Sequence, residues 1–165
     1  MEAPPILGLS FNTRNLGLAV VKEDQLVDYS SKLHKEIWTL QKKEMILTSL
    51  ASCIGAYSIK KVVLSIPHER HQTKEFTELM NGIIALAQMQ NIEVITYSSK
   101  DLLQFIPDSK KKNKNAFMRH LVFLYPELVP WFEKELRNKN KYYYKMFEAS
   151  GVATLYSRKS GTWRK

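Results

Sequence analysis

The sequence of residues 6–21 reads Ile6-Leu7-Gly8-Leu9-Ser10-Phe11-Asn12-Thr13-Arg14-Asn15-Leu16-Gly17-Leu18-Ala19-Val20-Val21. Two apolar runs flank a short polar segment, which predicts a strand, a tight turn and a second strand antiparallel to the first. Gly8 and Gly17 have no Cβ atom, so another backbone or a ligand can approach the chain closely at these two positions.

The rest of the chain predicts alternating strands and helices. Further strands are expected at residues 25–33, 60–67 and 92–97, and helices at residues 35–57, 72–90, 99–105, 116–125, 131–136 and 142–156. The first three strands follow one another closely and form an antiparallel meander. The fourth and fifth strands are reached through helices, so they lie parallel in the same sheet. This order predicts an α/β fold with a mixed five-stranded sheet (three antiparallel strands, then two parallel) flanked by helices.

The hairpin at residues 6–21 resembles the first hairpin of ribonuclease-H-like nucleases, and most closely that of the RuvC group of Holliday junction resolvases. The order of elements is similar to that of the ribonuclease-H-like fold over nearly the whole chain. We therefore expect one domain over residues 1–165, with residues 157–165 as a flexible basic tail.

The resemblance also implies where a catalytic site is expected. Nucleases of this fold cut phosphodiesters with two divalent metal ions, which need carboxylate ligands. In the RuvC group these acids lie at the end of the first strand, on the fourth strand and in a D-x-x-D-A-like start of the last helix. Carried onto this chain, they fall on Ser10, Ser65, Phe147 and Ser150, with Glu148 one residue off register. We therefore expect no metal, no catalytic residues and no nuclease activity.

Two other metal sites remain open from the sequence. A rearranged magnesium site would use Glu148, Glu69 or Asp101 as stand-in acids, and the chain would then be an active structure-specific endonuclease. His68 and His71 have the spacing of a zinc-binding pair, but no further ligand follows at a convincing distance, so a polar loop is the preferred interpretation.

The charge of the chain favours a polyanionic partner. Its net charge is +9, from 25 Lys and Arg against 16 Asp and Glu. Two basic clusters are the main candidates for nucleic-acid binding. One lies at residues 110–120, and the other lies at residues 137–145, where tyrosines lie among the basic residues. The predicted nucleic-acid-binding residues are Arg14, Lys110, Lys111, Lys112, Lys114, Arg119, Lys141 and Lys145.

These observations favour a RuvC-like domain that binds structured or branched nucleic acid through a basic face, DNA rather than RNA, without nuclease activity. A protein-interaction module is the alternative outside nucleic-acid binding; an actin-like ATPase is disfavoured by the short chain. Resolvases of this group act as dimers because a junction has two cut sites, so a homodimer is conceivable here. The single cysteine, Cys53, fits a reducing cytoplasm, and the absence of a long apolar run predicts no membrane span.

Overall fold

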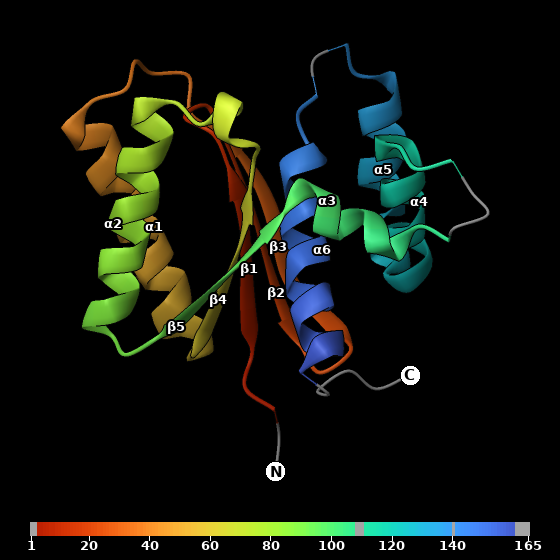
Figure 1. Ribbon diagram of the computed structural model, residues 1–165, viewed down its shortest axis with the longest axis horizontal. Coiled ribbons are helices and arrows are strands. Elements are labelled where there is room, and N and C mark those ends of the chain that lie inside the picture. Colours follow the sequence, from red (N-terminus) through yellow and green to blue (C-terminus); the bar gives the residue numbers. More distant parts are fainter. Residues whose placement is uncertain (1–2, 108–110, 140, 161–165) are drawn as a thin grey trace.

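A computed structural model describes residues 3–107, 111–139 and 141–160. Five strands form one sheet in the order β3-β2-β1-β4-β5 (Figure 1). The strands are β1 (Ile6–Phe11), β2 (Asn15–Lys22), β3 (Gln25–Leu33), β4 (Lys61–Ile66) and β5 (Glu93–Ser98). Strands β1, β2 and β3 pair antiparallel, whereas β4 and β5 run parallel to β1. The predicted mixed α/β sheet is thus confirmed.

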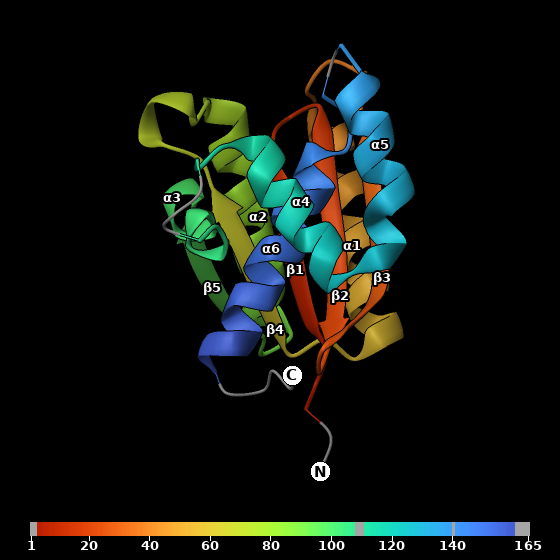
Figure 2. The ribbon, with the colours of Figure 1, turned by 90° about the vertical axis from the view of Figure 1, so that its right-hand side faces the viewer.

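Helices cover both faces of the sheet. One face carries α1 (Leu40–Tyr57) and α2 (Lys74–Met89), and the other carries α6 (Tyr144–Lys159), with α4 and α5 outside it (Figures 1 and 2). The remaining helices are α3 (Ser99–Leu102), α4 (Lys114–Leu124), α5 (Val129–Arg137) and the short 3-10 helices η1 (Glu69–His71), η2 (Leu103–Phe105) and η3 (Pro126–Leu128). No helix in the described ranges is long and apolar enough to cross a membrane.

The alternation of side chains along β1 separates two hydrophobic cores. Leu7, Leu9 and Phe11 pack against α1 and α2, in one buried cluster. Their neighbours along the strand, Ile6, Gly8 and Ser10, face α6 instead, as the two-residue period of a strand requires. Ser10 is therefore a buried polar residue on the α6 side of the sheet.

Gly8 and Gly17 allow α6 to lie directly on the sheet. A Cβ atom on Gly17 would overlap the backbone of Lys145, and one on Gly8 would overlap the carbonyl oxygen of Ala149. The close approach predicted at the two glycines is made by the backbone of α6. It fixes the position of the first turns of this helix over β1 and β2.

Several helix ends differ from the sequence prediction by one or two residues, and two differ by more. The helix expected at residues 35–57 begins only at Leu40, because Thr39 accepts a hydrogen bond from the backbone N–H of Lys42 as an N-cap. The final helix continues to Lys159, and Ser157 within it is fully buried. Residues 157–159 are thus helical rather than part of a tail, while residues 161–165 lie outside the described residues.

Candidate nucleic-acid interface

The carboxyl ends of β1 and β4 bring two predicted site residues side by side. Ser10 on β1 and Ser65 on β4 are register partners in adjacent parallel strands. Both are buried, with exposed fractions of 1% and 3%. The two serines that the resemblance places at the acid positions are therefore neighbours in space.

Glu148 of α6 completes a cluster with Ser10 and Lys145. The hydroxyl of Ser10 donates to Glu148 Oε1 at 2.9 Å, and Lys145 Nζ donates to the same oxygen at 3.2 Å. Glu148 is buried, with only 5% of the residue exposed. We call these three residues the Ser10–Glu148–Lys145 cluster.

Phe147 and Ser150, the two predicted positions in the last helix, make contacts other than with Ser10. Phe147 packs in the core against Phe132, with ring centroids 6.4 Å apart, and so does not face Ser10. Ser150 donates its hydroxyl to the backbone carbonyl of Met146 within the helix. The carboxylate that reaches Ser10 is that of Glu148, one residue after Phe147 in the helix. Lys145 and Glu148 are three residues apart and therefore share one side of the helix.

The donor set of this cluster does not fit a divalent metal ion. Glu148 supplies its only carboxylate, and that carboxylate already accepts bonds from a hydroxyl and an ammonium group. Hard cations such as Mg²⁺ need several oxygen ligands, and a bound ammonium repels a second cation. Within residues 3–107, 111–139 and 141–160, no group of three or more His, Cys, Asp or Glu side chains is placed to hold a metal ion.

His68 and His71 line the same pocket as Glu148, but within the described residues the other candidate ligands do not join Glu148 in a metal site. Asp101 accepts hydrogen bonds from the backbone and hydroxyl of Ser98 and forms a capping box for α3. Glu69 is exposed at the start of η1. The rings of His68 and His71 are 6.4 Å apart, and the described part of the chain adds no third metal ligand beside them.

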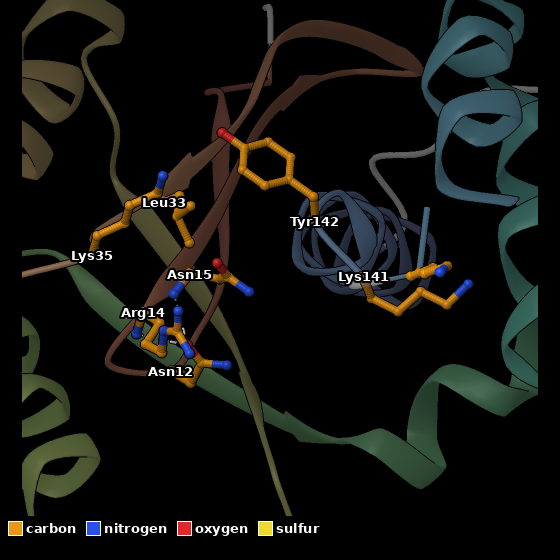
Figure 3. A pocket seen from close by; sticks show the side chains of 8 residues that line it. Asn12, Arg14, Asn15, Leu33, Lys35, Lys141 and Tyr142 are labelled. Atoms are coloured by element: carbon orange, nitrogen blue, oxygen red, sulfur yellow. Dashed lines mark hydrogen bonds between the residues drawn. The ribbon is translucent and has the colours of Figure 1, made fainter. Parts of the chain in front are cut away.

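Two adjoining pockets extend from the cluster along the end of the sheet. The first has a volume of about 660 Å³ and lies between the β1–β2 turn and the segment before α6 (Figure 3). The second, of about 510 Å³, includes Glu148 and Lys145. Asn12, Asn15 and Lys141 line both, so the pockets form one continuous depression, which we call the basic groove. Its charged residues are Arg14, Lys35, Lys114, Lys139, Lys141, Lys145 and Glu148.

Local hydrogen bonds fix the hairpin side of the basic groove. The side-chain oxygen of Asn12 accepts from the backbone N–H groups of Arg14 and Asn15, at 2.8 and 2.7 Å. This Asx turn closes the β1–β2 hairpin and directs the exposed Arg14 to the groove (Figure 3).

A buried glutamate fixes the opposite side. Glu135 of α5 is fully buried, and its Oε1 accepts from the backbone N–H groups of Tyr142 and Tyr143 at 3.0 and 2.9 Å. Ser31 of β3 donates its hydroxyl to the carbonyl of Tyr142 at 2.6 Å. The segment that carries Lys141 is therefore held between α5 and the sheet (Figure 3).

The structure brings together some of the predicted nucleic-acid-binding residues and separates others. Arg14, Lys114, Lys141 and Lys145 line the basic groove, and Lys114 Nζ lies 4.8 Å from the centre of the Tyr144 ring. In contrast, Lys111 and Arg119 line a separate pocket of about 560 Å³ beside His120 and Phe123. Lys112 is exposed, and Lys110 lies outside the described residues.

The sequence prediction missed Lys35 and the two asparagines of the hairpin turn as groove residues. Lys35 was assigned to a helix, but the segment before Thr39 is an extended loop, held by Lys42, whose ammonium donates to the carbonyls of His34 and Glu36. The N-cap signal of Thr39, followed by the apolar positions of α1, marks the true helix start and would have left Lys35 in a loop.

Comparisons with known proteins identify relatives by structure only. No protein-family model matches the sequence, and no curated protein is similar to it in sequence. RuvC of Thermus thermophilus, solved in complex with a Holliday junction substrate, superposes with a TM-score of 0.71 at 12% identity, over 97% of this chain and 98% of that chain. A second structure of Thermus thermophilus RuvC gives a TM-score of 0.69 at 11% identity, over 94% and 96% of the two chains.

The Fowlpox virus resolvase, solved in complex with Holliday junction DNA, is also similar. Its TM-score is 0.57 at 13% identity, over 93% of this chain and 99% of that chain. The fold is RuvC-like. The similarity spans nearly the full length of all three solved chains.

Proposed function

We propose that this chain is a RuvC-like DNA-binding domain that recognises branched DNA through the basic groove and does not cut it. The observation that carries the proposal is the composition of the groove, in which six Lys and Arg side chains meet a single carboxylate. Cations at this density suit the phosphate backbone, because each contact releases condensed counterions from the DNA.

Recognition by shape fits the arrangement of these cations. They come from the β1–β2 turn, the segment before α1, the start of α4, the segment between α5 and α6, and the start of α6, which are separate elements of one fold. Phosphate contacts made from several directions fix the orientation of a nucleic acid without reading its bases. The RuvC-like fold supports DNA as the preferred ligand, since two of the structural neighbours were solved with Holliday junction DNA.

The absence of nuclease activity is supported by the Ser10–Glu148–Lys145 cluster. Two-metal hydrolysis needs several carboxylates that converge on the metal ions. Here hydroxyl groups occupy the two strand positions, and the carboxylate of Glu148 is paired with Lys145. Stable duplex and junction strands in the presence of Mg²⁺ are the expected result.

The proposal is tested by fluorescence anisotropy with a labelled four-way junction at two salt concentrations. Lys141→Met is expected to weaken binding by about eightfold at 0.1 M salt, the value for one phosphate contact. Lys60→Met is the matched control, because this substitution removes the same charge. Lys60 is exposed just before β4, at the end of the strand away from the groove. Equal losses in the two variants, or no wild-type binding at low salt, would contradict the proposal.

The assembly that binds the junction is a separate question. A four-way junction has two-fold symmetry, which a homodimer of this chain would match. Sedimentation of the complex measures the number of chains per junction, and a ratio of two is the expected result. A ratio of one chain per junction would contradict the dimer but not the basic groove as the binding site.

A further inference from the structure

We propose that Lys145, held in place by Glu148 and Ser10, binds a DNA phosphate directly and makes binding independent of divalent metal ions. This inference rests on the proposed function and assigns the chemistry at the end of the basic groove that holds Glu148. There the cluster joins the pocket of about 510 Å³.

The position of Lys145 suits a phosphate ligand. Its side chain is 23% exposed and lines the pocket, while that of its partner Glu148 is only 6% exposed. An ammonium group has three N–H donors, and the hydrogen bond to Glu148 Oε1 uses one of them. Because Lys145 lines the pocket, a phosphate oxygen bound there can accept from another of its donors.

Glu148 acts as a positioning residue in this arrangement. Its carboxylate forms an ion pair with Lys145. Lys114 and Lys141 line the same pocket, so the pocket keeps an excess of positive charge that favours a phosphate at Lys145. The hydrogen bond from Ser10 orients Glu148 from the side of the sheet, because Ser10 belongs to β1. A flexible lysine side chain is thereby held close to one position before DNA arrives, which reduces the entropy lost on binding.

The same geometry disfavours a metal ion at this point. The ammonium of Lys145 and a divalent cation would compete for Glu148 Oε1, and the ammonium is covalently tethered three residues away on the same helix. The positive charge that a metal ion supplies at a phosphate is then supplied by the lysine. Binding that needs no metal is the direct consequence.

The test compares junction binding in EDTA and in Mg²⁺ at matched ionic strength. For the wild-type chain we expect dissociation constants within twofold of each other. Lys145→Met, which keeps most of the aliphatic stem, is expected to weaken binding by about eightfold at 0.1 M salt and to lower the salt slope by roughly 0.9 in both buffers. Lys145→Arg retains the charge and is expected to restore affinity to within twofold, and Lys60→Met serves again as the charge-matched control.

Several outcomes separate this inference from the proposed function. Wild-type binding that strengthens more than fivefold in Mg²⁺, or heat of Mn²⁺ binding in calorimetry of the free protein, would overturn metal independence. Equal salt slopes for Lys145→Met and Lys60→Met would overturn the phosphate contact. Both results leave DNA binding by the groove intact, whereas the absence of wild-type binding in either buffer removes the proposed function itself.

Discussion

Replacing Gly17 with alanine tests how α6 is seated on the sheet. A Cβ atom at Gly17 would lie closer than 3.0 Å to the backbone carbonyl of Lys145 and to the amide nitrogen of Met146. Backbone atoms in a packed helix cannot rotate away as a side chain can. The whole first turn of α6 would therefore have to move away from β2. This turn carries Lys145, and Glu148 follows one turn later.

The size of the effect follows from this geometry. Overpacking a core by one methyl group costs typically about 1–3 kcal/mol of stability. We expect the upper end, about 3 kcal/mol, because the backbones of both β2 and α6 resist the displacement. For a chain of this length each kcal/mol lowers the melting temperature by roughly 2–4 °C, so a decrease of about 6–12 °C is expected.

Gly55→Ala is the matched control for the same chemical change. Gly55 lies within α1, and a Cβ atom there meets nothing within 4 Å. Alanine in a helix interior is favoured over glycine by about 0.8–1.0 kcal/mol, so this variant is expected to be more stable than the wild type. Urea unfolding followed by circular dichroism measures both variants. If Gly17→Ala were as stable as the wild type, the direct contact between α6 and the sheet would be refuted.

Two further predictions concern Glu135, which supports the basic groove, and His120, which lines the separate pocket that holds Lys111 and Arg119. Glu135→Ala leaves the backbone N–H groups of Tyr142 and Tyr143 without their acceptor. We expect the free energy of unfolding to fall by about 2–4 kcal/mol and junction binding to weaken. The control is Glu133→Ala on the exposed side of α5, which should change both quantities little. Burial, and then the charge of Arg158, lower the pKa of His120 below its ordinary 6.5, so the unfolded chain takes up this proton first as the pH falls. Urea unfolding should therefore show stability that falls from pH 7.5 to pH 5, and a smaller fall in His120→Gln; identical pH profiles would contradict the assignment.

The sequence predicted the sheet well because its signals are local. The 6–21 hairpin, the apolar run of β4 and the helical crossovers give strand order and direction without knowledge of distant contacts. The start of α1 was misplaced because the apolar residue Ile37 extends the helical pattern, although it is 85% exposed in the structure. The N-cap of Thr39 overrides that pattern.

The candidate site was predicted less completely, because it depends on contacts between residues far apart in the chain. Ser10 and Glu148 are 138 residues apart, and only the packing of α6 on Gly8 and Gly17 shows that Lys145 and Glu148 face the sheet. The acidic motif in the sequence has no carboxylate at its first position, so spacing alone did not fix its register. The structure shows that Glu148 is the residue of α6 that bonds Ser10.

The central claim is that the basic groove binds branched DNA and leaves it uncut. The most direct measurement titrates the chain against a labelled four-way junction and a duplex of equal length at 50 and 200 mM salt with Mg²⁺, and then separates the recovered strands on a denaturing gel. We expect tighter binding to the junction, a loss of affinity of about a hundredfold between the two salts if four cations contact phosphates, and strands of full length. Equal affinity for junction and duplex, or shortened strands, would contradict the account.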